Sequence, residues 1–248
     1  MFHETYALRP GETIRRVAPP FLPERLDYFR KVQPSRTVNP VALLVLWRDG
    51  ALQLKNWMYY VRSDGDSGFE AEQLIQSLLK LYPQDIEGDL ELARKVIPGD
   101  FVANADADID QYRLALEKLV SETSGRAVSL TFREVPRPVI VFTGTWSPQA
   151  PHLIQIYGSQ MNNAPTVRVS LGSIDHFAKW VGSWIGESVI VEAAGAPHEL
   201  SLCGHDRDRA PEALKQAHDP QLVCTHIHEQ TGLDWREETR ALRRLFVE

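Results

Sequence analysis

The sequence predicts an α+β fold made of repeated helix–strand units with mixed and antiparallel sheets, preceded by a proline-rich arm and a β-hairpin. Two observations predict this class. A helix that ends at a glycine and leads into a strand occurs twice with the same punctuation, at Leu116–Gly125 and at Leu222–Gly232. Helix and strand patterns are also intermixed with at least one hairpin, which fits mixed sheets better than a doubly wound parallel fold.

The strands that follow these two helices are similar as well. The first opens with Phe132-Arg133-Glu134 and the second with Trp235-Arg236-Glu237, and each has a further arginine three residues on. A third helix–glycine–strand unit, Ser173–Glu192, is less similar in detail. The first two units suggest a duplication with a boundary in Thr145–Pro151. The predicted organisation is a proline-rich arm at 1–40, a first α+β unit at 41–148 and a second α+β unit at 149–248.

Composition and charge exclude some classes of function. The chain is 43% hydrophobic and 24% charged, as ordinary globular proteins are. Its net charge is −6 and its acidic and basic residues are interspersed, so we expect no nucleic-acid binding. The longest apolar run, Val41–Trp47, falls far short of the roughly 18 residues of a membrane span. Met1–Tyr6 has neither the basic nor the apolar region of an export signal.

The first part of the chain contains an arm and a hairpin. Residues 1–40 hold six prolines, which fix φ and remove donors, so we expect an extended arm laid on the body with one short helix at Glu24–Lys31. The strands Val41–Trp47 and Leu52–Tyr60 then flank Asp49-Gly50. This dipeptide supplies the two positive-φ residues of a type I′ turn, so the sequence predicts a hairpin here.

Apolar residues at helical spacing predict further helices at Glu70–Leu81, Ala107–Ser121 and Ser173–Trp184. The aspartates around the start of the second of these are explained by helix capping rather than by a calcium loop, because the EF-hand glycine and glutamate are missing. These aspartates are Asp100, Asp106, Asp108 and Asp110. Short strands are expected at Asp100–Ala103, Val139–Phe142, His152–Tyr157, Thr166–Ser170, Ser188–Glu192, Leu200–Cys203 and Leu242–Val247.

The chain contains a familiar series of elements. They are an apolar helix at Ile174–Ile185 followed by Gly186 and an apolar strand, the helix end Glu229-Gln230-Thr231-Gly232-Leu233, and the strand Arg133–Val139. Through them, residues 95–248 resemble a family of soil-associated bacterial proteins of unknown function. The chain departs from that family at Glu187-Ser188, where the family has Arg-Pro. The resemblance implies this fold and an exported or periplasmic location, and it supplies no catalytic residues. The units are also similar in pattern to the N-terminal modules of secretins and TonB-type proteins.

Cysteine and histidine residues between positions 203 and 228 offer a chemical alternative. Cys224 and His228 are spaced i, i+4 on a predicted helix, so both can reach one zinc ion, and Cys203 or His205 can complete the site. Either thiol can also act as a nucleophile, and the two can pair. No C-x-x-C or H-E-x-x-H motif is present. Cys224 and His228 point away from the core if the helix packs by Leu222, Val223 and Ile227.

Arginine and aromatic side chains are candidates for partner binding, by charge or by contact area. The candidates are Arg133, Arg137, Arg236, Arg240, Trp57 and Tyr59. Strands broken by Pro136 and Pro138 also offer edges for strand addition. Because no convergent catalytic set is recognisable, the sequence predicts a non-catalytic binding or structural module for protein–protein assembly, with itself or with another protein, and without a cofactor. A metal- or thiol-dependent hydrolase is the alternative.

Overall fold

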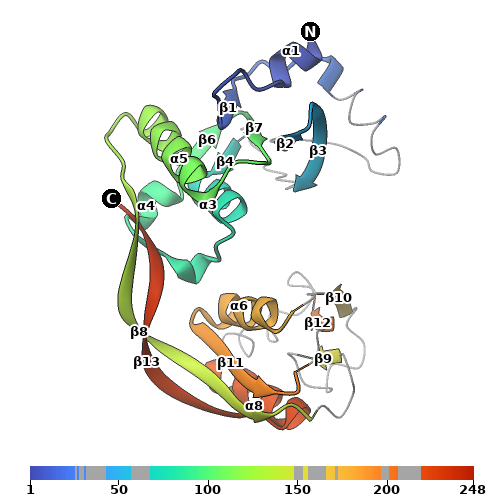
Figure 1. Ribbon diagram of the computed structural model, residues 1–248, viewed down its shortest axis with the longest axis vertical. Helices are drawn as coiled ribbons and strands as arrows, with labels where there is room; N and C mark the ends of the chain where they lie inside the picture. Colours follow the sequence, from blue (N-terminus) through green and yellow to red (C-terminus); the bar gives the residue numbers. More distant parts are fainter. Residues whose placement is uncertain are drawn as a thin grey trace. The chain divides into compact units, whose positions relative to one another are not determined.

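The computed structural model describes residues 1–25, 27, 31, 43–56, 68–147, 153–155, 166–170, 173–196, 201–205 and 219–248 (Figure 1). The chain divides into two compact units, each discontinuous in sequence. Unit 1 comprises Met1–Leu81, Ile86–Phe132 and Leu245–Glu248, and unit 2 comprises Tyr82–Asp85 and Arg133–Arg244. Mixed and antiparallel sheets occur together with helices, which confirms the predicted α+β class. The division at 40 and 148 stays a prediction.

A four-stranded mixed sheet lies in unit 1, in the order β1-β7-β2-β3. β2 and β3 pair antiparallel about Asp49 and Gly50, whose φ angles are 50° and 70°, so the predicted hairpin and its turn are confirmed. β2 is parallel to β7, and β1 is antiparallel to β7. The N-terminal segment, expected to be an extended arm, thus supplies a sheet strand and the short helix α1. The bounds are α1 Phe2–Tyr6, β1 Ile14–Val17, β2 Leu44–Arg48, β3 Ala51–Asn56 and β7 Asp100–Asn104.

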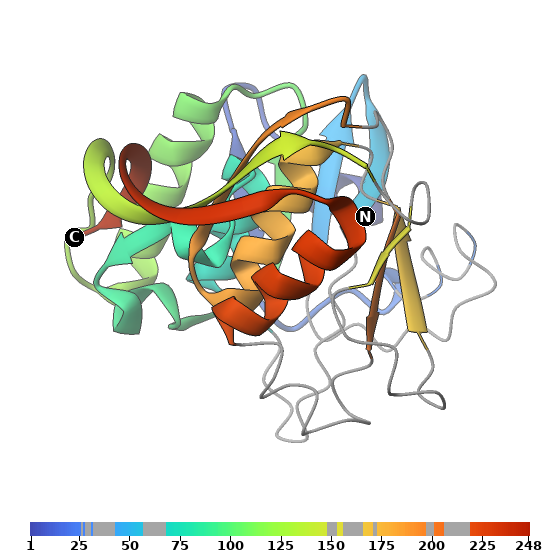
Figure 2. The ribbon, with the colours of Figure 1, turned by 90° about the horizontal axis from the view of Figure 1, so that it is seen from below.

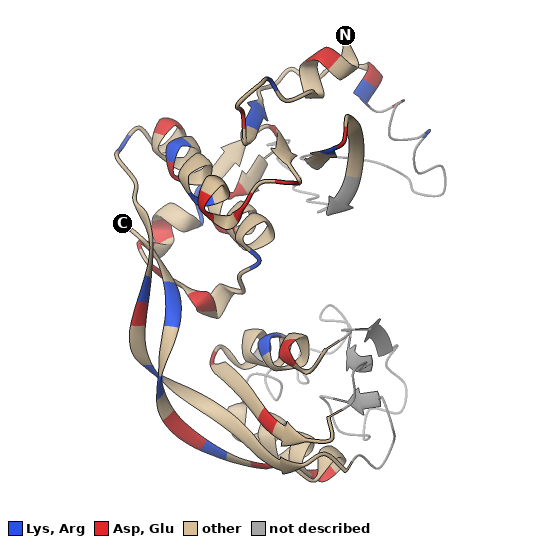
Figure 3. Cartoon of the chain, viewed as in Figure 1, with Lys and Arg blue, Asp and Glu red and all other residues tan. Residues whose placement is uncertain are grey.

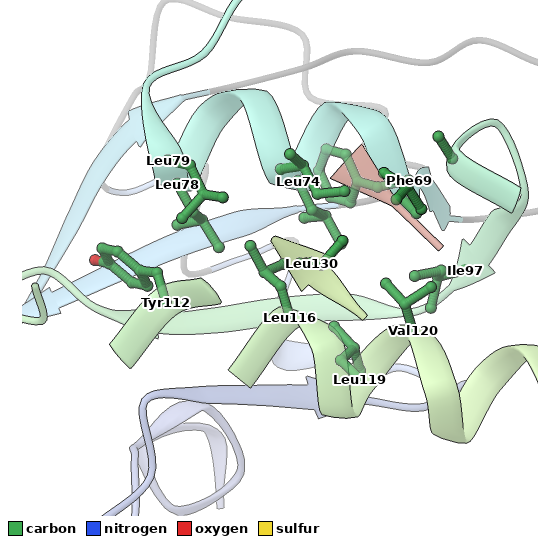
Figure 4. Packing of buried hydrophobic residues seen from close by; sticks show 14 of the residues in the cluster. Phe69, Leu74, Leu78, Leu79, Ile97, Tyr112, Leu116, Leu119, Val120 and Leu130 are labelled. Atoms are coloured by element: carbon green, nitrogen blue, oxygen red, sulfur yellow. The ribbon is translucent and has the colours of Figure 1, made fainter. Parts of the chain in front are cut away.

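The helices α3 (Ala71–Leu79) and α5 (Ile109–Ser124) bury their apolar faces in one cluster of unit 1 (Figure 4). Leu74 and Ile75 of α3 and Leu116 of α5 are at most 1% exposed. Their spacing is the helical pattern from which both helices are predicted. Burying each such side chain contributes about 1.5–3 kcal/mol. Shorter elements complete the unit: β4 Gly68–Glu70, β5 Ile86–Gly88, α4 Leu90–Ala93 and β6 Val96–Pro98.

Unit 2 contains three neighbouring strands in the order β11-β8-β13, with β11 parallel to β8. The helices α6 and α8 contribute to one apolar cluster with Ile140 and Phe142 of β8. Figure 2 shows β13 (red) running alongside β8 (yellow-green). A second sheet has the order β10-β12-β9. The bounds are η1 Pro83–Asp85, β8 Leu130–Thr145, β9 Leu153–Gln155, β10 Thr166–Ser170, α6 Ile174–Ile185, β11 Ser188–Ala194, β12 Ser201–His205, α8 Pro220–Thr231 and β13 Asp234–Val247.

Helix ends follow the capping signals in the sequence. The Asp108 carboxylate accepts a hydrogen bond from the Gln111 backbone N–H at 2.8 Å, which caps α5 as predicted. The helices α5, α6 and α8 each end at a glycine in the left-handed conformation, at Gly125, Gly186 and Gly232, with φ of 74°, 75° and 70°. The predicted helix–glycine–strand succession is therefore confirmed at all three places. Its origin by duplication stays a prediction.

β8 is not interrupted by the two prolines within it. An edge, a bulge or a corner is expected at Pro136 and Pro138, and the strand is continuous from Leu130 to Thr145. Its pairing with β11 begins only at Val139, so both prolines stand in a stretch that has no partner on that side among the described strands. The edge interpretation is thus confirmed, because a missing donor there costs no ladder hydrogen bond.

The face by which α8 packs differs from the expectation. Leu222 is 52% exposed, whereas Cys224 is buried together with Val223, Ile227 and Thr231. The buried residues form the pairs 223/227 and 227/231, spaced i, i+4, with Cys224 beside them on the same face. Packing by Leu222 is therefore wrong, and Cys224 points into the core.

Asp100 does not cap a helix, contrary to the prediction. It is the first residue of β7 and is fully buried, and the Tyr6 hydroxyl donates to its Oδ2 at 2.8 Å. Arg25 Nε lies 2.9 Å from the same oxygen, and the Arg25 guanidinium lies 4.1 Å from the centre of the Phe21 ring. Burial raises the pKa of Asp100 to about 7, although Arg25 and Tyr6 act to lower it. This buried network ties the N-terminal segment to β7.

Candidate interaction surface

The middle parts of β8 and β13 are open to solvent on both faces. From Arg133 to Pro138 on β8, and from Asp234 to Arg243 on β13, every residue is exposed or half-buried. Figure 3 shows basic and acidic residues following one another along these strands, which are neighbours in the sheet. A strand in a packed sheet normally buries one face. We therefore treat this part of unit 2 as the candidate interaction surface.

Two arginines of β13 donate hydrogen bonds to the same glutamate. Arg236 Nε donates to Glu238 Oε1 at 2.5 Å, and Arg240 Nε donates to Glu238 Oε2 at 2.8 Å. Arg240 Nη1 also donates to Glu192 Oε1 on β11 at 2.7 Å, and Arg236 Nη1 donates to Thr143 Oγ1 on β8 at 3.4 Å. Alternate residues of a strand share a face, so the network covers one face of the sheet β11-β8-β13.

The electrostatics of this face follow from its hydrogen bonds. The bonds from Arg240 and Arg236 hold the pKa of the Glu238 carboxyl below its ordinary value. The bonds to Glu192 and Glu238 raise the pKa of Arg240 above its ordinary value. Both groups therefore stay charged across the physiological range. Because solvent screens exposed ion pairs, they contribute little to stability and can be rearranged when a partner binds.

The two strands of this surface have different outer edges. On β8, Pro136 and Pro138 have no N–H to offer to an added strand. On β13, no proline occurs between Asp234 and Val247, and its neighbour on the outer side, β5, pairs only with Leu245–Val247. Among the described strands, none pairs with the outer edge of β13 between Asp234 and Arg244. The edge that can accept a strand is thus that of β13, and not the proline-containing edge that the sequence suggests.

The structure brings together some of the predicted partner-binding residues. Arg236 and Arg240 lie in the network just described, while Arg133 and Arg137 lie on the open part of β8. Arg137 Nη1 donates to the Pro136 carbonyl at 2.9 Å. Trp57 and Tyr59 lie outside the described residues. A role for any of these residues in binding stays a prediction.

Glu238 and Glu192 were not predicted as part of the site. The signal for Glu238 is present in the sequence, because it stands two residues from both Arg236 and Arg240 and so shares their face. No such signal exists for Glu192. It reaches Arg240 only because β11 pairs parallel with β8, which places Glu192 opposite Thr143.

The predicted cysteine and histidine cluster is described only in part. Cys203 and His205 belong to β12, and their side chains lie outside the described part of the chain. Cys224 is a free, fully buried thiol, whereas the His228 side chain is 48% exposed with its Nδ1 2.9 Å from the Leu233 carbonyl oxygen. Burial raises the pKa of Cys224 to about 12, with Glu187 and Glu237 adding to the shift. Cys224 is therefore protonated at neutral pH, and a protonated thiol is a poor nucleophile. Within the described residues, no three His, Cys, Asp or Glu side chains are grouped as a metal site requires.

The state of Cys224 is directly testable. We expect iodoacetamide at pH 8 to alkylate Cys224 at least about a hundredfold more slowly in the folded protein than in denaturant, because the reactive thiolate is scarce and the sulfur is buried. Peptide mass spectrometry separates this residue from Cys203. Equal labelling rates in the folded and unfolded chain would show that the thiol is accessible, and would support the alternative that the protein is a thiol-dependent hydrolase.

Unit 1 has a hollow of about 620 Å³ between the end of α3, β2 and the start of α5. Its main polar groups are already engaged within the unit. Arg48 Nη2 donates to the Ala105 carbonyl at 3.0 Å and its Nε lies 2.8 Å from Asp106 Oδ1, while the Tyr112 hydroxyl donates to the Asn104 carbonyl at 2.5 Å. These groups shape the wall of the hollow, which Lys80 and Ser77 also line.

Comparison with known proteins adds no relative. No family model, curated protein or solved structure matches the chain. The resemblance to the soil-associated family, and the exported location that it implies, therefore stay predictions. Among the described helices, none has the length and apolar character needed to cross a membrane.

Proposed function

We propose that this protein is a non-catalytic binding or structural module that mediates protein–protein assembly through the outer edge of β13. One observation carries the proposal: the edge from Asp234 to Arg244 has no neighbouring strand among those described and contains no proline. In strand addition, main-chain hydrogen bonds supply affinity and the alternating side chains supply specificity. The charged network around Arg236, Glu238 and Arg240 provides such side chains.

Charged residues on an edge also discourage indiscriminate pairing, and natural sheets use them for that purpose. An edge that serves only this purpose is typically short, twisted away or interrupted by proline. The edge of β13 is long and uninterrupted, while the neighbouring β8 carries the two prolines. This asymmetry favours a selective binding edge on β13.

A single substitution tests the proposal. Thr239→Pro removes one donor near the middle of the edge, at an exposed residue. We expect a tagged wild-type chain, purified from its own cells, to retain a stoichiometric protein partner that the T239P variant loses, with the same circular dichroism spectrum for both. A wild-type protein that elutes as a lone monomer, or a partner retained equally by both chains, contradicts the proposal.

A further inference from the structure

We propose that the outer edge of β13 pairs antiparallel with the same edge of a second copy of this chain, with the two-fold axis at Thr239. The inference rests on the proposed function, because it names the partner of that edge. A two-fold interface uses the same surface on both subunits, so the sequence of the edge must be complementary to its own reverse. The sequence of β13 satisfies this condition for one position of the two-fold axis.

The orientation of the main chain limits where the axis can lie. The Val247 carbonyl accepts from the Asp89 N–H at 2.8 Å on the outer side of β13. Main-chain groups alternate along a strand, so the odd-numbered residues, Thr239 included, present N–H and C=O to the outer edge. Directly opposed residues of an antiparallel pair are either both hydrogen-bonded or both not. In a pair of identical edges they must therefore both be odd or both be even, and the axis passes through a residue.

The charges then select one residue. With the axis at Thr239, Glu238 of each copy faces Arg240 of the other, and no two like charges are opposed between Trp235 and Arg243. Opposite charges that face each other across strands stabilise the pair, and like charges destabilise it. Arg244 lies outside this window because it is buried and its Nη1 lies 2.6 Å from Asp85 Oδ1.

Other positions of the axis fail by the same rule. An axis at Glu237 or Glu238 sets that glutamate against its own copy, and an axis at Arg236 or Arg240 sets arginine against arginine. An axis at Ala241 or Leu242 shortens the pairing and forms no ion pair within the window. Only Thr239 combines a long overlap with ion pairs and no repulsion.

The chosen axis also places the ion pairs at favourable positions. Glu238 and Arg240 are even-numbered, so they occupy the non-hydrogen-bonded positions of the new pair, where opposed Cα atoms are only about 4.5 Å apart. Within its own chain the Glu238 carboxylate has two nitrogens of Arg236 at Oε1 and only Arg240 Nε at Oε2, and a carboxylate oxygen can accept about two bonds. A further bond from the second copy's Arg240 can therefore be added without loss of the existing ones.

Disulfide trapping tests the register. Thr239→Cys places two thiols across the axis with Cα atoms about 5.5 Å apart, within the range that a disulfide spans. We expect T239C to form a covalent dimer under mild oxidation. Ala241→Cys is the matched control, since residue 241 is also exposed and odd-numbered but lies about 13 Å from its own copy in this register. The unsubstituted chain, with Cys203 and Cys224, gives the background.

Charge reversal tests the complementarity. We expect Glu238→Arg and Arg240→Glu each to weaken dimerisation about tenfold or more, because each opposes like charges twice across the axis. The double variant E238R/R240E restores opposite charges and is expected to recover most of the affinity. Glu134→Arg makes the same charge change on β8 and is expected to leave the dimer unaffected. Sedimentation velocity over about 1–100 µM measures all four, with melting temperatures recorded beside them.

The outcomes separate this inference from the proposed function. A dimer that T239C traps, that A241C does not, and that the double reversal rescues supports the inference. A monomer throughout the concentration range, trapping through A241C, or a double variant no better than the singles overturns it. A different protein that binds the wild type and is lost in T239P overturns the second copy as partner, yet leaves the proposed function standing.

Discussion

Replacing Gly88 by alanine is expected to lower the free energy of unfolding by about 3 kcal/mol or more, from backbone strain and steric clash together. Gly88 ends β5 with φ +97°, a conformation that residues with a side chain rarely adopt. An added Cβ would also collide with the Val247 carbonyl oxygen and lie 3.0 Å from the Val247 nitrogen. Both are backbone atoms of β13, so neither can rotate away.

Gly125→Ala is the matched control for this prediction. Gly125 also has a positive φ, +74°, but nothing lies within 4 Å of the position of its Cβ. Only the conformational strain of about 1–2 kcal/mol is therefore expected there. Urea denaturation followed by tryptophan fluorescence compares the two variants. If G88A were no less stable than G125A, the close approach of β5 to β13 would not exist in solution.

The fold could be predicted from the sequence where the signal is local. The helix α3, the Asp49-Gly50 hairpin and the glycine ends of α5, α6 and α8 all depend on residues within a few positions of one another. Apolar spacing, a turn dipeptide and a capping residue are sufficient for each. The predicted bounds of these elements accordingly lie within a few residues of the observed ones.

The rest depends on contacts between distant parts of the chain, for which one sequence holds no signal. β1 became a strand because β7, far along the chain, pairs with it. The sequence around Asp100 suggests a helix cap, because the partners that bury it, Tyr6 and Arg25, lie far away in the proline-rich segment. The arginines of the candidate surface were found from their repeated spacing, whereas Glu192 became visible only through the register of β11 with β8.

The second large effect concerns the buried network at Asp100. Replacing Arg25 by methionine keeps an apolar side chain but removes the guanidinium group, whose Nε lies 2.9 Å from Asp100 Oδ2. We expect Arg25→Met to cost little stability at pH 6 and about 2 kcal/mol more at pH 9. Urea denaturation of wild type and variant at a series of pH values measures the difference.

The sign follows from the linkage of protonation to folding. The pKa of Asp100 in the folded protein is about 7, above its ordinary value of 3.8. Its contribution to stability is therefore fully present below about pH 4 and is lost as the pH rises through 7. Arg25 lowers that pKa, so its removal raises it further and the loss continues above pH 7, by up to about 1.4 kcal/mol per pH unit.

Two controls decide whether this mechanism is the cause. The double variant R25M/D100N has no group at the site that titrates between pH 6 and pH 9, because burial raises the pKa of Tyr6 above its ordinary value of 10. Its stability difference from the wild type is therefore expected not to grow above pH 7. Lys118→Met removes a cation from an exposed pair, 3.8 Å from Glu122, and is expected to show no such pH dependence. A constant cost of R25M from pH 6 to pH 9 would mean that Asp100 is already ionised at pH 6, and that Arg25, rather than burial, governs its charge.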